Sequence, residues 1–452
     1  MGSETADRSR RGLRSGSIVI TAFHVVAWLA LAIVAGLVFL ILFEPGIAYR
    51  ATAPSAALDS HQFLGLVAAV VDAQLLGKSR VEVLTNGRQF YEAELEAIRA
   101  ARHSIHLEAY VFRPGRVTEH LLDALAERAR AGVAVRVVID AIGSFPMRHR
   151  RLRSLRAAGG VVTRYYPIRW YTLKRINNRT HREIIVVDGR IGFTGGADFA
   201  DLWAGDADPG EEGRGRPWRD TMLRIEGELV GGLQTTFVEN WLEATGELLA
   251  GEEEFPFCRA DSPVPAAGSV TGLVISSTPS AGGATRARML YQLLIASARD
   301  RIEICSPYFV PDSSMREELA RAARRGVTVR IIVPGQYSDH RMVRWTSRRL
   351  FGELLRSGIE IHEYRPAMFH AKIVIVDGVW SVLGSTNFDN RSFGLNDEIN
   401  VAIVDRGVAT RVGEDFTRDL ERSDRVSLDT WSNRSLVERA TGALLSVFAR
   451  LQ

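Results

Sequence analysis

Cysteine and lysine are scarce in this sequence, and each scarcity narrows the range of functions. Two cysteines in 452 residues are too few for a disulfide framework or a cysteine-based zinc site. Only three of the 57 basic residues are lysines, namely Lys78, Lys174 and Lys372. The net charge of +4 is too small to indicate a nucleic-acid-binding protein, so no nucleic-acid partner is expected. The hydrophobic content of 46% excludes a disordered or fibrous chain, and the length predicts two domains.

Charged residues are absent from positions 18–43. A helix of this length would reach about 39 Å, enough to cross a bilayer core of about 30 Å. Because arginines precede the run, the positive-inside rule predicts a basic cytoplasmic tail over residues 1–17, a single-pass cell-membrane anchor over 18–43 and an extracytoplasmic catalytic part. The sequence Ala51-Thr52-Ala53 would also suit signal-peptide cleavage, but the run exceeds the usual apolar core of about 7–15 residues. Residues 44–79 are expected to form a juxtamembrane linker with a helix.

An internal repeat organises the remainder of the chain. Residues 104–112, 132–139 and 181–188 match residues 301–309, 326–333 and 370–377. Alternating strands and helices predict the α/β class, and continuous apolar runs predict strands that are covered on both faces. We expect a first domain over residues 80–250, a linker over 251–268, a second domain over 269–425 and a C-terminal amphipathic helix over 426–452.

Each repeat carries a histidine in a motif suited to phosphate chemistry. In the second repeat, His370, Lys372 and Asp377 form the pattern His-x-Lys-x4-Asp, and Ser385 and Asn387 follow in a loop. Residues two apart on a strand project from the same face, so the imidazole and the ammonium group are expected side by side. An imidazole surrounded by ammonium, hydroxyl and amide groups is typical of phosphoryl transfer. The alternative, a core histidine with a solvated lysine, is disfavoured because the motif falls at matching places in both repeats.

The paired motifs and the loops Gly195-Gly196 and Gly384-Ser385 resemble those of the phospholipase D superfamily, and residues 80–425 are most similar to bacterial cardiolipin synthases. The resemblance implies two tandem α/β/α sandwich domains, related by a pseudo-twofold axis, that form one active site. It also implies a two-step reaction through a phosphohistidine, without a metal or another cofactor. The partners so implied are anionic membrane phospholipids, with a phosphatidyl group passing between phosphatidylglycerol molecules.

The resemblance also assigns roles to individual residues. By family order His181 is the nucleophile and His370 the general acid and base, although the sequence leaves an exchange of these roles open. Alignment of the repeats nominates Asp220 and Glu398 as the carboxylates that orient the histidines. The groups expected at the substrate phosphate are Lys372, Ser385, Asn387, Gly195, Gly196 and Lys174. Asp188 and Asp377 each precede a glycine and are interpreted as turn residues.

The first repeat departs from the family pattern at two positions. Glu183 stands where the pattern has lysine, and Asp198 stands where it has asparagine, so the formal charge of this half-site falls by three. Three interpretations stay open: Glu183 activates the acceptor alcohol or binds a headgroup, the site is degenerate, or other cations replace the lysine, among them Arg179, Arg182, Lys174 and Arg175. A transferase is expected, with a phosphodiester hydrolase or a weakly active lipid-binding homologue as the alternatives.

Overall fold

The computed structural model describes residues 23–34, 36, 48–170, 177–206, 215–251, 253–256, 269–280 and 284–445, and the chain divides into two compact units, residues 1–47 and 48–452. In the first unit, residues 23–34 and 36 are helical and exposed, and the other residues of the predicted anchor at 18–43 lie outside the described ranges. Over those ranges, no helix combines the length and the apolar character that a membrane crossing requires. The anchor therefore stays a prediction.

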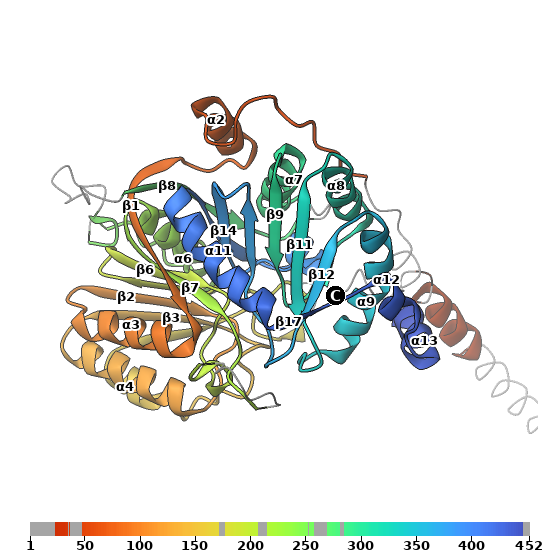
Figure 1. The fold of residues 1–452 in the computed structure, drawn as a ribbon. Helices are drawn as coiled ribbons and strands as arrows, with labels where there is room; N and C mark the ends of the chain where they lie inside the picture. Colours follow the sequence, from red (N-terminus) through yellow and green to blue (C-terminus); the bar gives the residue numbers. More distant parts are fainter. Residues whose placement is uncertain are drawn as a thin grey trace, which may run out of the picture. The chain divides into compact units, whose positions relative to one another are not determined.

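The second unit is built around one sheet of 15 strands (Figure 1). The strands of the first repeat lie in the order β1 (Leu76–Thr85), β7 (Thr221–Gly227), β6 (Ile191–Gly195), β5 (Ile184–Val187), β2 (Ser104–Ala109), β3 (Ala134–Asp140) and β4 (Val161–Tyr165). Those of the second lie in the order β8 (Val270–Ser277), β16 (Glu398–Val404), β14 (Trp380–Gly384), β13 (Ile373–Val376), β9 (Arg301–Cys305), β11 (Thr328–Pro334), β12 (Glu360–Tyr364) and β17 (Ser423–Arg425). Apart from the edge strand β17, the two orders match strand for strand, as a repeated unit requires.

The two repeats are joined at the centre of the sheet. Strand β1 pairs antiparallel with β8, with Leu76 opposite Gly272. Helix α6 (Leu229–Thr245) of the first repeat packs on β8, and α11 (Arg406–Glu421) of the second repeat packs on β1. The tandem repeats therefore share a single continuous sheet, which the sequence does not predict.

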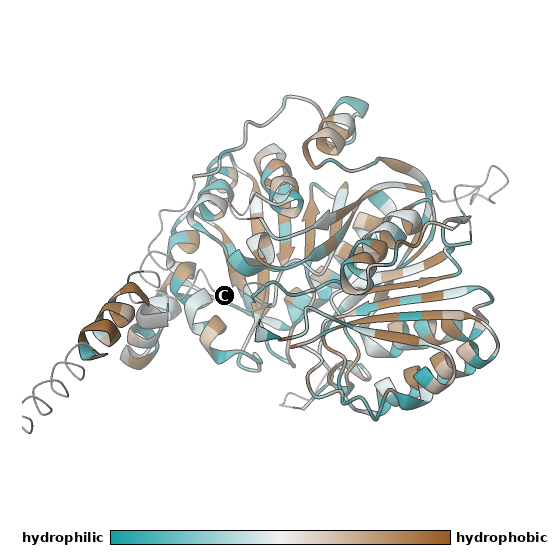
Figure 2. Ribbon diagram, turned by 180° about the vertical axis from the view of Figure 1, so that it is seen from behind, coloured by the Kyte–Doolittle hydropathy of each residue, from teal (hydrophilic) through white to brown (hydrophobic). Residues whose placement is uncertain are grey.

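Apolar side chains cover both faces of the sheet, because neighbouring residues of a strand project to opposite sides. On β5, Ile185 packs in the cluster that contains α3 (Asn86–Ala100) and α4 (Arg116–Arg130), whereas Ile184 packs in the cluster that contains α6 and α11. The second repeat has its own cluster, to which α2 (His61–Val70), α7 (Arg286–Ser297), α8 (Ser313–Arg324) and α9 (Arg341–Arg356) contribute. Figure 2 shows hydrophobic residues concentrated along the strands and hydrophilic residues on the outer sides of the helices.

The chain beyond the second repeat packs on α9. Two short helices, α12 (Leu428–Ser432) and α13 (Leu436–Leu445), follow β17. Glu438 on α13 accepts a hydrogen bond of 2.6 Å from Arg348 Nε on α9. The single amphipathic helix predicted over residues 426–452 is thus divided into two helices as far as residue 445, and residues 446–452 lie outside the described ranges.

Asp188 and Asp377 occupy equivalent turns, at the ends of β5 and β13 that are remote from the histidines. Their φ angles of 53° and 52° are left-handed, a conformation that aspartate tolerates in turns. The carboxylate of Asp188 accepts hydrogen bonds from the backbone N–H groups of residues 102–104, and that of Asp377 from those of residues 299–301. Each aspartate thus ties a hairpin turn to the start of a neighbouring strand.

Replacing Asp188 with alanine should lower the free energy of unfolding by about 2–3 kcal/mol, because three backbone donors lose a charged acceptor. Urea unfolding followed by tryptophan fluorescence measures the change. Asp123→Ala, at an exposed position on α4, is the matched control and should change stability by about 0.5 kcal/mol or less. Equal stability of the two variants would show that the Asp188 turn contributes nothing.

Candidate active site

Each histidine lies three positions before the first residue of a buried strand and is held by the backbone of the other repeat. His181 precedes β5 and His370 precedes β13, and all four residues of each strand are buried. The backbone N–H of His181 donates to Asp397 O at 2.8 Å, and that of His370 donates to Arg219 O at 2.8 Å. Isolated parallel β-bridges pair Thr180 with Asp397 and Arg219 with Phe369. The two motifs are therefore brought together by exchanged contacts between the repeats.

The exchange extends to the side chains, because each repeat supplies the carboxylate that orients the histidine of the other. Nδ1 of His370 lies 2.8 Å from Oδ2 of Asp220, and Nδ1 of His181 lies 3.2 Å from Oε2 of Glu398. Both carboxylates are fully buried. In each pair Nδ1 contacts the carboxylate, so Nε2 is the nitrogen that can take part in the chemistry. Nε2 of His370 also lies 3.2 Å from Nζ of Lys372.

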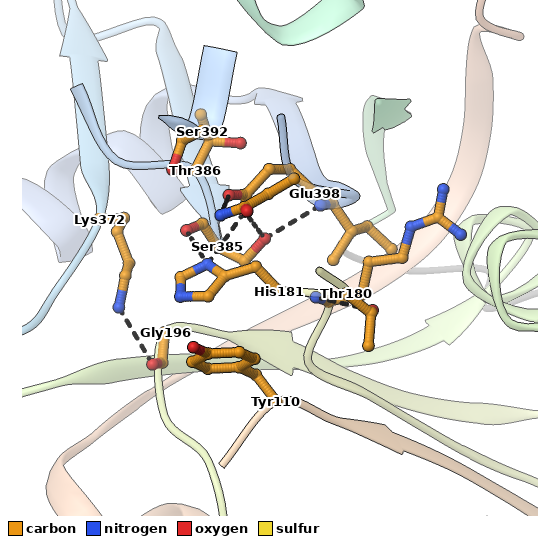
Figure 3. Close-up of polar contacts among 12 residues, drawn as sticks. Tyr110, Thr180, His181, Gly196, Lys372, Ser385, Thr386, Ser392 and Glu398 are labelled. Atoms are coloured by element: carbon orange, nitrogen blue, oxygen red, sulfur yellow. Dashed lines mark hydrogen bonds and ion pairs between the residues drawn. The ribbon is translucent and has the colours of Figure 1, made fainter. Parts of the chain in front are cut away.

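Other hydrogen bonds fix the two carboxylates in place. Trp203 Nε1 donates to Asp220 at 3.0 Å. The Ser385 hydroxyl donates to Glu398 and accepts a hydrogen bond of 3.0 Å from the backbone N–H of Ile399. Ser385, predicted as a phosphate ligand, therefore uses its hydroxyl to position Glu398, and its carbonyl oxygen is a second acceptor 3.1 Å from Nδ1 of His181 (Figure 3).

Lys372 lies between the two half-sites and is 3% exposed. Its Nζ donates to Gly196 O at 3.1 Å (Figure 3). It also donates to His370 O at 2.9 Å and lies 2.7 Å from Nδ1 of the His370 ring. Gly195 and Gly196 pack closely against Asp220 and Thr221 because they have no side chains. A Cβ on Gly196 would lie 2.4 Å from Asp220 Oδ1, and one on Gly195 would lie 2.5 Å from Thr221 O.

The two histidines differ in their electrostatic environments. Burial and the neighbouring Lys372 ammonium group lower the pKa of His370, although Asp220 opposes the shift. Burial also disfavours charge on His181, but Glu398 outweighs it and raises the pKa of His181 above its ordinary value. The pKa of Asp220 is lowered, because Lys372 and His370 outweigh its burial. Relative to a free imidazole, the site therefore favours the neutral form of His370 and the protonated form of His181.

Glu183 and Asp198 form a buried pair in the first half-site. Their side chains are hydrogen-bonded to each other, and burial together with the charge of Asp198 raises the pKa of Glu183 well above its usual range. Asp198 also accepts hydrogen bonds from the backbone N–H groups of Tyr110 at 3.1 Å and Val111 at 2.9 Å. The raised pKa favours the neutral form of Glu183, which makes the charge deficit smaller than the formal count of three.

The arginines considered as substitutes for the missing lysine are engaged elsewhere. Arg179 is buried against Asp140, with Nε 3.3 Å from Oδ2. Arg182 donates to Thr236 O at 2.9 Å and to Glu239 at 2.9 Å. Neither residue lines the cleft, and Lys174 and Arg175 lie outside the described residues.

His181 and His370 line a cleft of about 620 Å³. Its walls include aromatic side chains that were not predicted as site residues, together with two arginines: Tyr110, Trp203, Trp218, Tyr308, Arg113 and Arg391. Tyr110 and Tyr308 follow the matching strands β2 and β9, so the repeat itself could have pointed to them. Asn387 also lines the cleft, and its Oδ1 has no hydrogen-bond partner in the described part of the chain. The described residues include no cluster of three His, Cys, Asp or Glu side chains placed to hold a metal ion.

The sequence and the fold are similar to those of known proteins. A sequence model of the family described as "Cardiolipin synthase, PLD-like domain" matches residues 95–202 and 291–420. The chain is 35% identical over 365 residues to cardiolipin synthase 2 of Bacillus anthracis, which covers 80% of this chain and 68% of that protein. It is 36% identical over 386 residues to a cardiolipin synthase of Geobacillus sp. (strain WCH70), with 84% and 75% covered. A solved phosphatidylserine synthase of Haemophilus influenzae Rd KW20 has a TM-score of 0.64 at 16% identity, covers 86% of this chain and 97% of its own, and shows the fold alone.

Proposed function

This chain belongs to the cardiolipin synthase family with the PLD-like domain, and from that membership we propose that it transfers a phosphatidyl group from one phosphatidylglycerol molecule to another. The products are cardiolipin and glycerol. The observation that carries the proposal is the pair of histidines, each oriented through Nδ1 by a buried carboxylate of the other repeat. Two such groups at one cleft suit a reaction that needs both a nucleophile and a proton carrier.

The reaction proceeds in two balanced steps. In the first, Nε2 of one histidine forms a bond to phosphorus, the bond between phosphorus and the glycerol oxygen breaks, and the other histidine gives its proton to that oxygen. In the second, a hydroxyl oxygen of another phosphatidylglycerol attacks phosphorus, its proton passes to the second histidine, and the P–N bond breaks. Lys372 supplies positive charge beside the phosphoryl oxygens, where charge accumulates.

Attachment to the cell membrane through residues 18–43 is part of the proposal, with the catalytic unit on the extracytoplasmic side. The absence of charge over this run and the preceding arginines support it. Tethering would keep the cleft close to its anionic phospholipid substrates and raise their effective concentration.

The purified full chain, incubated with phosphatidylglycerol vesicles, tests the proposal by analysis of the lipid products. Cardiolipin and glycerol in equal amounts are expected. Phosphatidic acid as the main product would replace the transferase with a hydrolase, because water would then act as the acceptor. Retained vesicle binding without any product would leave only an anionic-lipid-binding protein. His370→Ala is the control and should form no product.

A further inference from the structure

We propose that Glu183, which stands where the family pattern has lysine, gives the two histidines different roles. His370 attacks phosphorus and His181 carries the proton. This assignment rests on the proposed transfer reaction. It reverses the order that the family resemblance predicts, in which His181 is the nucleophile.

The asymmetry is visible when matching positions of the two half-sites are compared. In the second half-site, Nζ of Lys372 lies 2.7 Å from Nδ1 and 3.2 Å from Nε2 of His370. In the first, the matching position beside His181 holds Glu183, which is hydrogen-bonded to Asp198. One histidine therefore has an ammonium group against its ring, whereas the other has a pair of carboxyl groups nearby.

An ammonium group in contact with an imidazole opposes a second positive charge, so His370 keeps the neutral form that has an electron pair on Nε2. The groups that act on His370 are Asp220 on the β7 side, Lys372 and, more weakly, Asp339, and its lowered pKa agrees with this balance. A neutral imidazole is the form that forms a bond to phosphorus.

His181 has the opposite balance of neighbours. Glu398 lies 3.2 Å from its Nδ1, and Asp198 and Asp389 add negative charge from two further segments, whereas Lys372 is the opposing cation. The centroid of the Tyr110 ring lies 5.2 Å from that of the His181 ring. The raised pKa of His181 agrees with a protonated ring. A lysine at position 183 would add a second cation and remove this preference, which is the physical consequence of having glutamate there.

The assignment fixes the course of each step. Nε2 of His370 displaces glycerol from phosphorus, and the proton on Nε2 of His181 goes to the departing oxygen. His181 then takes the proton of the incoming hydroxyl group, the new P–O bond forms, and the P–N bond to His370 breaks. Atoms and protons balance over the cycle, because His181 and His370 return to their starting states.

A substrate whose leaving group needs no proton separates the two roles. Phosphatidyl-p-nitrophenol in mixed micelles, with full-chain protein, is expected to give one equivalent of p-nitrophenol per His181→Ala molecule, and a stable phosphatidyl adduct on His370. In the His370→Ala variant, the rate of this single-turnover release (burst) of p-nitrophenol should be lower by about 10³-fold or more. A burst in His370→Ala, with the adduct on His181, would overturn the assignment.

Rapid quench of the wild-type protein in denaturant at alkaline pH, where the bond between phosphorus and a histidine nitrogen survives, gives the same information without a variant. Mass spectrometry of the quenched peptides should find the phosphatidyl group on His370, and its recovery on His181 would overturn the assignment even if both alanine variants failed to fold. The failure of the proposed function is distinguishable: wild-type protein would then make no cardiolipin from phosphatidylglycerol vesicles. Cardiolipin formation with the adduct on His181 would instead retain the function and remove only this inference.

The pH dependence of glycerol release should carry the signature of Glu183. Activity requires neutral His370, so it rises with pH through the lowered pKa of that residue, and it requires protonated His181, so it is lost as pH rises through the raised pKa. Glu183→Lys adds a cation beside His181 and should move the alkaline limb by about one pH unit to lower pH. Glu183→Gln, which keeps the shape without a charge, should leave that limb in place. An alkaline limb at the same pH in both variants would contradict the role given to Glu183.

Discussion

Replacing Lys372 with methionine is expected to lower kcat for glycerol release from phosphatidylglycerol by about 10³-fold. The side chain is buried and its Nζ donates to the carbonyl oxygens of Gly196 and His370. Its charge also acts on Asp220, Glu183 and Asp198. Without it the phosphodiester loses a positive charge beside its oxygens, and a unit charge at about 4 Å contributes about 4 kcal/mol at an effective dielectric constant of about 20.

Lys78→Met makes the same chemical change at an exposed position on β1, and it is the matched control. Its kcat should equal that of the wild-type protein. Loss of the Lys372 ammonium group should also raise the pKa of His370, so the acid limb of the pH profile should move to higher pH. An Lys372→Met variant within tenfold of wild type, with an unmoved acid limb, would contradict the placement of this cation at the phosphate.

Much of the fold was predictable because the repeat fixes which segments correspond. Two strands with a histidine before them and an aspartate after them, β5 and β13, were identified from the motifs alone, and the matching strand orders agree with that correspondence. The antiparallel pairing of β1 with β8 was not predictable. It depends on the meeting of two strand edges from distant parts of the chain, and no local pattern specifies such a partner. The predicted domain boundaries and the anchor at 18–43 stay predictions.

The candidate site was predictable in its residue types but not in its pairings. Sequence alignment of the repeats selects Asp220 and Glu398, but the contact of each with the histidine of the other repeat follows from the exchanged backbone bonds at residues 181 and 370. The protonation of Glu183 depends on burial and on the proximity of Asp198, so the formal charge count misjudged it. The contact of Ser385 with Glu398 was not predictable either, because only the fold brings the Ser385 hydroxyl to that carboxylate.

Asp220→Asn is expected to lower kcat by about 10⁴-fold, the scale of effect known when a buried carboxylate that orients a catalytic histidine is made neutral. Asp220 is fully buried, lies 2.8 Å from Nδ1 of His370 and is ionised, since Lys372 and His370 lower its pKa. An amide at this position cannot reproduce the charged acceptor, so the imidazole loses the tautomer that exposes the electron pair of Nε2. Steady-state glycerol release measures the effect, and urea unfolding checks that the variant is folded.

Glu398→Gln is the matched comparison in the other half-site, and its effect should be smaller, about 10²-fold to 10³-fold. Nδ1 of His181 has a second acceptor in the carbonyl oxygen of Ser385 at 3.1 Å, so its ring keeps an orienting partner after the charge is removed. The hydrogen bonds around His370 give it no second oxygen acceptor at Nδ1 among the described residues. A larger loss in Glu398→Gln than in Asp220→Asn would contradict this difference, because it would make the His181 side the more dependent on its carboxylate.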